Sequence, residues 1–559
     1  MLVRYWITVC AVLSLLLSPG QNFAAELSAP IVIYGGTSAG VMAALQAAKQ
    51  GQDVILVEPG QHFGGMSVEG LGGSDIDNHG EFQNSPAVGG LALEFYRRVA
   101  KHYGNSAKFE AMLKSGGKQP GLWRFEPHVA EKIFADWLAE YPKIKLLRGT
   151  RLREGQHLGF SHDPHTHPVL GLLKCESSIG DEINISGQVF IDATYEGDLL
   201  HATRVSTIIG REPNSKYNET KNGIREKTTH AQFTVKVDPY KTPGNPASGV
   251  IRTIQDEPLG TPGEGDKRLQ AYCFRMCLTK NPANRIPFAK PAQYDEENYE
   301  IYKRYVKAGG KLWKPGGTIP NGKTDQGSWH DLSANLYGMN MDYPGGNYAT
   351  RKRVYGEHLS FTQGLCWFLA NDPSMPEDIR AAWSAWGVCK DEFQDNGGWP
   401  RAFYVRDARR MVSDYVITEH HTRKEKQTPV EDPIAVAFWP PDTHHVRRIV
   451  RNGAAYNEGF VFGGNDWAPF GISYRSLVPK AIECTNLITA TCPSSSHVAY
   501  GAIRLEWTFM ALGQAAGSAA VEAVKNKSTV QEVKYDNLLK QLLADKQVIE
   551  LPTAKQESK

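Results

Sequence analysis

The sequence predicts an α/β protein with a central parallel sheet, into which a second domain of mixed α+β structure is inserted. Four short apolar runs without alternation, near residues 31, 53, 189 and 486, are typical of strands that helices cover on both faces. The first two runs flank a segment rich in small residues, which is the pattern of a βαβ unit. A long stretch separates the third run from the fourth, and this separation predicts the insertion.

Residues 1–25 are predicted to be a signal peptide. Arg4 supplies a positive start, and Trp6–Leu17 is an apolar run too short to span a membrane comfortably. Small residues suited to cleavage follow at Ala24 and Ala25. An uncleaved N-terminal anchor is the alternative. Since no later segment has the roughly 18 apolar residues of a membrane span, we expect an exported protein, periplasmic or extracellular, without stable membrane insertion.

Charge and cysteine content exclude several classes of protein. The 559 residues include 62 Lys and Arg against 60 Asp and Glu, a formal net charge of +2, which gives no basic field for nucleic acid. Seven of the eight cysteines follow the signal peptide, without C-x-x-C spacing, so we expect neither a disulfide framework nor a zinc or iron–sulfur site. The adjacent His444 and His445 lack acids in a matching spacing, and we predict no metal site.

The first βαβ unit contains a glycine-rich turn. A buried strand is predicted at 31–34, a helix from 41 to about 50, and a second strand from 53 to 58 that ends in an acid. The turn between the first strand and the helix consists of Gly35, Gly36, Thr37, Ser38, Ala39 and Gly40. This combination predicts nucleotide binding, and a purely structural βαβ unit is the alternative.

Individual residues of this unit have distinct expected roles. Gly35 allows the sharp turn, Gly40 allows the helix to approach the strand, and the helix N-terminus offers N–H groups to a pyrophosphate. Glu58 is placed to accept hydrogen bonds from ribose hydroxyls. Thr37 departs from the usual pattern, because it stands where a middle glycine would come closest to the phosphate.

The segment after Glu58 points to a nucleotide with a large flat ring. Pro59 follows the acid directly, and a turn of Gly64, Gly65 and Met66 comes soon after. Glycines remove side-chain bulk where the chain lies against a ring and its linker. A domain that binds only NAD has no need of this loop.

Two distant segments fit the same ligand. The strand at 189–194 ends in Asp192, Ala193 and Thr194. The strand at 486–491 is followed by a loop and by a long predicted helix at 503–524, in which Gly513 and Gly517 form a face suited to close packing. The N-terminal dipole of such a helix would stabilise negative charge on a reduced flavin.

Together these motifs resemble the family of FAD-dependent oxidoreductases of the glutathione-reductase-like superfamily. The segments that carry the resemblance are Ile31–Gly40, Glu58–Pro59, Gly64–Met66, Phe190–Asp198 and Cys492–Gly501. More narrowly, the chain is similar to an exported bacterial branch labelled FAD-dependent oxidoreductase or xanthan lyase, across residues 30–527. Relatives of the heterodisulfide reductase flavoprotein subunit belong to the wider family, but the cysteines for their iron–sulfur clusters are absent here.

The resemblance implies a Rossmann-like FAD/NAD(P)-binding domain with FAD as cofactor. The residues expected to bind it are Gly35, Gly36, Thr37, Ser38, Ala39, Gly40, Glu58, Pro59, Gly64, Gly65, Met66, Asp192, Ala193, Thr194, Ser496 and Gly501. The spacing of the motifs divides this domain into two parts, 30–205 and 451–527. Between them we expect an inserted substrate domain at 206–450, and after them a polar C-terminal tail at 528–559.

Candidate catalytic groups are those that we expect near the flavin ring. His497 is the first choice as a general acid or base, with a purely structural role as the alternative. Arg406 lies among several arginines suited to a carboxylate or sugar-acid substrate. For Arg504 and Glu506 a structural ion pair is the expectation. Three tryptophans that could stack on sugar rings are Trp399, Trp439 and Trp467.

Three functions compete on these observations. The leading prediction is an FAD-dependent oxidoreductase that takes a hydride from a small organic or carbohydrate-like donor and passes electrons to an unknown acceptor. The alternatives are a carbohydrate-processing, lyase-like enzyme with a structural FAD, and a non-catalytic binding protein that keeps the fold. No second complete nucleotide motif is present, which disfavours NAD(P)H as the reductant.

Overall fold

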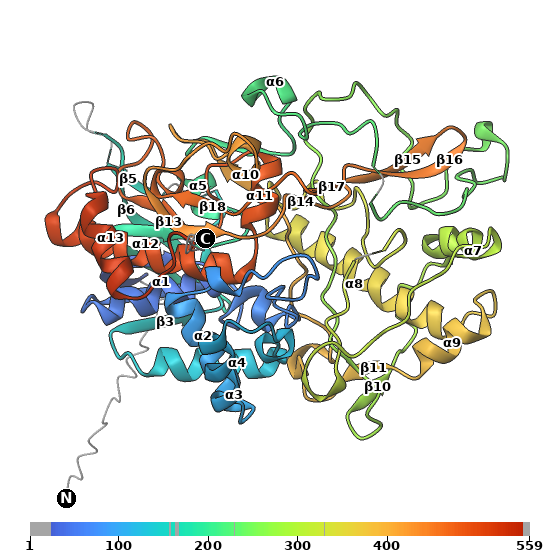
Figure 1. Ribbon diagram of the computed structural model, residues 1–559, viewed down its shortest axis with the longest axis horizontal. Helices are drawn as coiled ribbons and strands as arrows, with labels where there is room; N and C mark the ends of the chain where they lie inside the picture. The colour runs from blue at the N-terminus through green and yellow to red at the C-terminus, as the bar shows by residue number, and fades with distance from the viewer. Residues whose placement is uncertain (1–23, 156–157, 162–166, 229, 329, 552–559) are drawn as a thin grey trace, which may run out of the picture.

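The computed structural model describes residues 24–155, 158–161, 167–228, 230–328 and 330–551, so nearly all of the predicted signal peptide lies outside the described residues. The chain folds into two bodies (Figure 1). The first is a sheet covered by helices, and the second consists mainly of long loops packed around one long helix. The predicted α/β fold class with an inserted mixed domain is confirmed.

The central sheet combines parallel strands with an antiparallel extension. Its parallel strands are β1 (Ala25–Tyr34), β2 (Val54–Glu58), β3 (Ile144–Arg148), β7 (Glu182–Asp192) and β19 (Leu487–Thr489). The extension contains β4 (Thr150–Leu152), β5 (Gly159–Ser161) and β6 (Val169–Ser177). The order is β3-β2-β1-β7-β6-β4, with β19 beside β7 and β5 beside β6.

The register brings several strand ends to one edge of the sheet. Tyr34 at the end of β1 pairs with Asp192 at the end of β7, and Asp192 pairs with Thr489 at the end of β19. In a parallel sheet, ligands bind beyond the carboxyl ends of the strands. The glycine turn after β1 and the segment after β7 therefore meet at the edge where a nucleotide is expected.

Two helices pack closely on this sheet. Helix α1 (Ser38–Lys49) follows the glycine turn, and α12 (Glu506–Asn526) is the long C-terminal helix. A side-chain carbon at Gly513 would lie 2.1 Å from the carbonyl oxygen of Ala39, and one at Gly517 would lie 2.6 Å from that of Ala43. The small residues of α12 thus allow direct backbone contact with α1, as predicted from the sequence.

Further helices complete this body. They are α2 (Gly90–His102), α3 (Ser106–Ser115), α4 (Pro127–Ala139), α5 (Asp198–Ala202), α11 (His497–Ile503) and α13 (Tyr535–Ala544). Helix α13 lies in the segment that the sequence predicts to be a polar tail. Its Leu538 and Leu542 are buried in the main core, because the apolar residues of this short helix share one face, so most of the described tail is part of the fold.

The inserted body surrounds one long helix with short elements. Its helices are α6 (Asn214–Tyr217), α7 (Glu300–Lys307), α8 (Tyr348–Asn371) and α9 (Glu377–Ser384), whereas α10 (Glu419–Thr422) lies against α11 of the first body. The strands of this part of the chain are β8 (Thr207–Ile209), β9 (Leu278–Thr279), β10 (Arg285–Pro287), β11 (Gly387–Cys389), β12 (Arg409–Met411), β13 (Pro433–Ala437), β14 (Asp442–Thr443), β15 (Arg447–Arg451), β16 (Ala454–Glu458), β17 (Val461–Phe462) and β18 (Phe470–Ser473). A second hydrophobic core surrounds α8.

The chain crosses between the two bodies more often than the sequence predicts. Strand β13 pairs with β18, and both contribute to the main core. The hairpin of β15 and β16 lies between them in sequence, yet its Val450 and Ala455 pack against the second core. The chain therefore enters the first body at β13, leaves it at β15 and β16, and enters it again at β18, so one boundary at residue 450 does not separate the two bodies.

The seven described cysteines are all buried free thiols. Within the described ranges, the structure has no helix long and apolar enough to cross a membrane.

Candidate active site

The turn between β1 and α1 requires its glycines. Gly35 has a φ of +105°, and a side-chain carbon there would lie 2.6 Å from the carbonyl carbon of Ala193. At Gly40 such a carbon would lie 1.9 Å from the carbonyl oxygen of Gly35. The turn is thus held tightly against the end of β7, as expected for a chain that approaches a pyrophosphate.

Thr37 has a structural role that accounts for its departure from the glycine pattern. It is the N-cap of α1, where its Oγ1 accepts a hydrogen bond from Gly40 N at 3.3 Å. The same hydroxyl donates to the carbonyl oxygen of Ala193 at 2.7 Å. Thr37 therefore ties the glycine turn to the segment after β7.

Glu58 is held at the end of β2 by backbone groups. Its carboxylate accepts hydrogen bonds from Gly36 N and Gly60 N, each at 2.6 Å. Burial is the main cause that raises the pKa of Glu58 to about 7. The side chain is therefore fixed beside the glycine turn, in the position from which it would reach a ribose.

A pocket of about 380 Å³ opens beside these residues, and we call it the nucleotide pocket. The residues predicted from the sequence that line it are Gly35, Thr37, Glu58, Pro59, Gly65, Met66 and Thr194. The opposite wall of the nucleotide pocket comes from the inserted body, and its residues were not predicted from the sequence. That wall includes Tyr343, Tyr348, Arg351, Lys352, Tyr355, Arg401, Phe403 and Val405. Their spacing in sequence carries no motif, so only the fold reveals them.

The other predicted cofactor residues lie behind this lining. Gly36 donates to Glu58 and accepts a hydrogen bond from Gly64 N at 2.7 Å. Ser38, Ala39, Gly40 and Ala193 are buried in the turn and the start of α1. Asp192 accepts hydrogen bonds from Thr194 and Leu200, and burial raises its pKa to about 6. Ser496 is the N-cap of α11, and Gly501 packs against the backbone of Asp442.

A buried acid links the two helix starts at the inner end of the nucleotide pocket. Glu506 of α12 accepts hydrogen bonds from Ser38 Oγ at 2.6 Å and from the hydroxyl of Tyr195 at 2.7 Å. Tyr195 in turn accepts from Met66 N. Arg504 bonds instead to Tyr404, so the ion pair expected between Arg504 and Glu506 is wrong.

A second pocket of about 340 Å³ lies next to the first, and we call it the arginine pocket. It is lined by Leu71, Asp75, Asn78, His79, Arg275, Ser328, Tyr404, Arg406, Trp439, Asp442, His444, Phe462 and Arg504. Phe403 and Val405 line the nucleotide pocket, whereas Tyr404 and Arg406 line the arginine pocket. One segment of chain therefore forms a wall that the two pockets share.

The ionisable groups of the arginine pocket differ in charge state. Burial, reinforced by Arg406 and Arg504, lowers the pKa of His444 well below its usual value, so this imidazole is neutral. Arg504 donates to the hydroxyl of Tyr404 at 2.8 Å. Burial raises the pKa of Tyr404, which keeps the phenol protonated.

His497 lies away from both pockets. It is buried, its Nδ1 lies 3.3 Å from Oδ2 of Asp407, and its backbone N donates to Glu212. Neither the nucleotide pocket nor the arginine pocket includes it in the lining. Its predicted acid–base role stays a prediction; its ring nitrogens have no hydrogen-bond partner among the described residues, and the ring contacts the carboxylate of Asp407.

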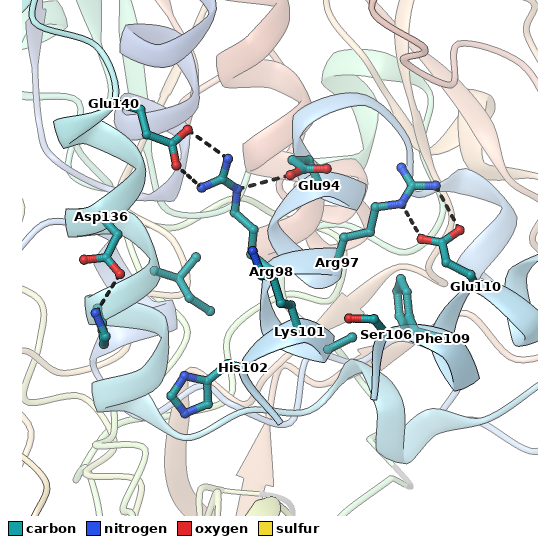
Figure 2. A pocket seen from close by; sticks show the side chains of 13 residues that line it. Glu94, Arg97, Arg98, Lys101, His102, Ser106, Phe109, Glu110, Asp136 and Glu140 are labelled. Atoms are coloured by element: carbon teal, nitrogen blue, oxygen red, sulfur yellow. Dashed lines mark hydrogen bonds and ion pairs between the residues drawn. The ribbon is translucent and has the colours of Figure 1, made fainter. Parts of the chain in front are cut away.

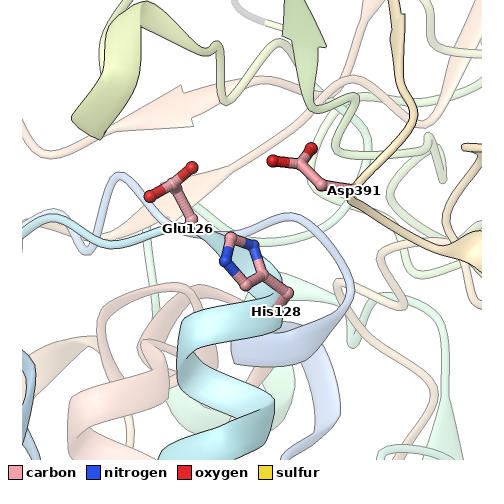
Figure 3. A group of neighbouring side chains, drawn as sticks. All are labelled: Glu126, His128 and Asp391. Carbon is pink, nitrogen blue, oxygen red and sulfur yellow. The ribbon is translucent and has the colours of Figure 1, made fainter. Parts of the chain in front are cut away.

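Outside these pockets, two clusters of charged side chains form ion pairs with one another. A groove on helices α2, α3 and α4 is lined by ion pairs such as Arg97–Glu110, Arg98–Glu140 and Lys132–Asp136 (Figure 2). Glu126, His128 and Asp391 face one another in a metal-like arrangement (Figure 3). The ammonium of Lys323 already lies 2.7 Å from Glu126 and 2.8 Å from Asp391, so this cluster is an ion network.

The fold and the glycine turn define a dinucleotide-binding protein of the flavin-dependent class. The chain belongs to the family described as FAD dependent oxidoreductase, which matches residues 30–542. It is thus an FAD-dependent oxidoreductase, and its cofactor is FAD. The tight glycine turn, the fixed Glu58 and the adjoining pocket fit this cofactor.

The solved structures that match this chain share little sequence with it. E. coli quinol fumarate reductase FrdA is 11% identical, with 93% of this chain and 74% of that chain covered and a TM-score of 0.34. L-proline dehydrogenase from P. horikoshii is 15% identical (36% and 27% covered, TM-score 0.17), and L-amino acid deaminase from Proteus vulgaris is 16% identical (35% and 55%, TM-score 0.23). The chain thus spans less than two thirds of the latter two. A search of curated proteins found no match.

Proposed function

We propose that the arginine pocket binds the hydride donor, a small organic or carbohydrate-like molecule, and that the electrons pass on to a second acceptor. The observation that carries this proposal is the wall from Phe403 to Arg406, which separates the nucleotide pocket from the arginine pocket by one segment of chain. Hydride transfer requires contact between the donor carbon and the flavin ring, so the proposal requires the ring to reach the boundary between the two pockets.

The residues of the arginine pocket supply what such an oxidation needs. FAD, when bound, accepts the hydride from the donor carbon. Burial and the arginines keep His444 neutral, which is the form of an imidazole that accepts a proton from a donor hydroxyl or amine, and the same effects make it a weak base. Tyr404, fixed by Arg504, can hydrogen-bond to the donor. The donor would thus lose a hydride to the flavin and a proton to His444, which together make a two-electron oxidation.

The experiment blocks the arginine pocket without touching the nucleotide pocket. Asn78 is an exposed residue of the arginine pocket, and Asn78→Trp would fill part of that space. We expect bound FAD to be unchanged and anaerobic bleaching of its absorbance by donors to be lost. Glu81→Trp, at an exposed site outside the lining, is the matched control. Unchanged bleaching in the Asn78 variant would place the donor elsewhere.

The same screen separates the alternative functions. A lyase-like enzyme with a structural FAD would form an unsaturated sugar product while the flavin stays oxidised. A non-catalytic binding protein would bind FAD and show neither product nor bleaching. The donors to test are alcohols, hydroxy acids, amines and sugars with their acids.

We also propose that the protein is exported, periplasmic or extracellular, with residues 1–25 removed. Cleavage after Ala25 would leave the pairs of β1 from Ile31 to Tyr34 with β2 intact. The mature N-terminus, determined by mass spectrometry on protein from the extracytoplasmic fraction, tests this proposal. An intact N-terminus on cytoplasmic protein would contradict it.

A further inference from the structure

We propose that the arginine pocket recognises a carboxylate, that Arg406 is its anchor, and that a sugar acid is the class of ligand. This inference rests on the proposed function, because it assigns a substrate class to the same pocket. Arg406 is a buried cation, and its hydrogen-bond partners among the described residues are all neutral.

Arg406 is 1% exposed and lines the arginine pocket. Its guanidinium donates to the carbonyl oxygen of Ala271, to Ser328 Oγ and to Asn335 Oδ1, and it contacts the sulfur of Cys273. None of the ion pairs found in the described ranges involves it, and its Nε has no hydrogen-bond partner there. A buried charge in this state is unfavourable until an anion arrives.

The other cations of the pocket are already balanced. Arg275 pairs with Asp325 at 2.6 Å, and Arg504 lies 3.7 Å from Asp442. Burial raises the pKa of Asp75, the remaining acid of the lining, and the nearby Arg275 opposes this rise. Among the described residues, Arg406 is therefore the one arginine of the lining without an ion pair.

A carboxylate meets this demand better than other anions of similar size. The four Nη hydrogens of the guanidinium already donate to Ala271, Asn335, Ser328 and Cys273, so Nε is the donor that remains for a carboxylate oxygen, and the charge of the group strengthens that bond. The pocket is also small, about 340 Å³, which suits a single ring or a short chain.

Part of the lining of the pocket is aromatic. His79, Trp439 and Phe462 line it, and the ring of Phe82 stacks on His79 at a centroid distance of 4.6 Å. Aromatic faces beside polar groups suit the apolar face of a sugar ring, whose hydroxyls remain free for hydrogen bonds. A sugar acid satisfies both the cation and this wall.

Direct binding to the FAD-loaded protein tests the inference without turnover. The probes are two matched pairs, acetate against acetamide and glucuronate against glucose, with binding followed by calorimetry and by the shift of the flavin spectrum. We expect each acid to bind at least about tenfold more tightly than its neutral partner, which corresponds to about 1.4 kcal/mol.

The variants are Arg406→Gln and, to keep the charge but remove the free Nε donor, Arg406→Lys. We expect the preference for acids to vanish in the first and to weaken in the second, with FAD content unchanged. Arg252→Gln, in an exposed ion pair of the inserted body, is the control. Equal binding of acids and neutral partners in the unmodified protein, or a preference that survives Arg406→Gln, would overturn the inference.

The failure of this inference is distinguishable from the failure of the proposed function. Acids that bind through Arg406 without bleaching the flavin, while other compounds bleach it in the Asn78→Trp variant, would leave the carboxylate site standing and refute the donor site. Neutral donors that bleach the flavin equally in the Arg406 variants would leave the donor site standing and refute the carboxylate site.

Discussion

The surroundings of Glu58 suit the binding of a ligand better than they suit a carboxylate in the protein alone. Its carboxylate is fixed by two backbone N–H groups, yet burial raises its pKa to about 7, so the charged form is disfavoured in the protein alone. Each carboxylate oxygen has room for a further hydrogen bond. Ribose hydroxyls would supply these bonds at the place where Glu58 lies.

Replacement of Glu58 by Ala should weaken FAD binding. Loss of an acceptor for two hydroxyls should raise the Kd at least about tenfold, or about 1.4 kcal/mol, as measured by fluorescence titration of the apoprotein. Asp53→Ala, at an exposed site just before β2, is the control. An unchanged Kd in the Glu58 variant would remove this residue from the ribose site.

His444→Asn tests the proposed base of the arginine pocket. Because loss of a general base typically costs about 10²- to 10⁴-fold, kcat should fall within that range while FAD stays bound. His445→Asn changes a buried neighbour that does not line the arginine pocket, and its kcat should stay near that of the unmodified protein.

The pH profile gives an independent check on His444. A base acts in its neutral form, and the pKa of this imidazole lies well below the usual 6.5. With a donor that does not itself ionise, kcat/KM should therefore stay level as pH falls through 6.5, where an ordinary histidine would become protonated. A decline centred near 6.5 would contradict the assignment.

At the scale of elements, the contact of α1 with α12 positions the glycine turn. Gly513 and Gly517 bring the backbone of α12 against Ala39 and Ala43 at the start of α1. The same approach places Glu506, at the first turn of α12, within hydrogen-bond distance of Ser38. The geometry of the nucleotide pocket therefore depends on two residues without side chains.

Gly513→Ala should destabilise the protein although alanine favours helices. The added carbon would lie 2.1 Å from a backbone oxygen, so the helices must separate. We expect a loss of about 1–3 kcal/mol in the free energy of unfolding, and a weaker affinity for FAD. Gly356→Ala in α8 meets nothing within 4 Å and should be neutral or stabilising by up to about 1 kcal/mol. Similar effects of the two variants would contradict the packing argument.

The elements that bind the nucleotide could be predicted from the sequence because their signals are local. The turn from Gly35 to Gly40 and the acid at Glu58 lie within one βαβ unit, and the end of β7 resembles a family motif. The wall formed by Tyr348, Arg351 and Phe403 comes from segments without a motif. The roles of Tyr195 and His444 depend equally on contacts between distant segments.

At the scale of the whole molecule, the site lies where the two bodies meet. The sequence predicts the insertion from the spacing of motifs, but the chain alternates between the two cores from β13 to β18. His497 follows the last sheet strand in sequence, which made it a candidate near the ring, yet its side chain is enclosed beside Asp407. Arg406, the other candidate, does line a pocket, because the segment from Phe403 to Arg406 lies between the two cavities.

Glu506 makes the stability of the apoprotein depend on pH. Burial raises its pKa from 4.5 to about 7, although hydrogen bonds from Ser38 and Tyr195 oppose this change. Because the folded protein holds this proton more tightly than the unfolded chain, the contribution of Glu506 to stability is fully present below pH 4.5. It is lost as pH rises through the folded-state pKa near 7.

Glu506→Gln should remove this dependence, because glutamine does not ionise. Urea unfolding of the two apoproteins at several pH values isolates the effect, since other titrating groups are common to both. The difference in free energy of unfolding should shift in favour of the variant by about 1–3 kcal/mol between acid and alkaline pH, with the change between pH 4.5 and 7. If the difference stays constant across that window, Glu506 is ionised in the folded protein, and the charge at the start of α12 must be reassigned.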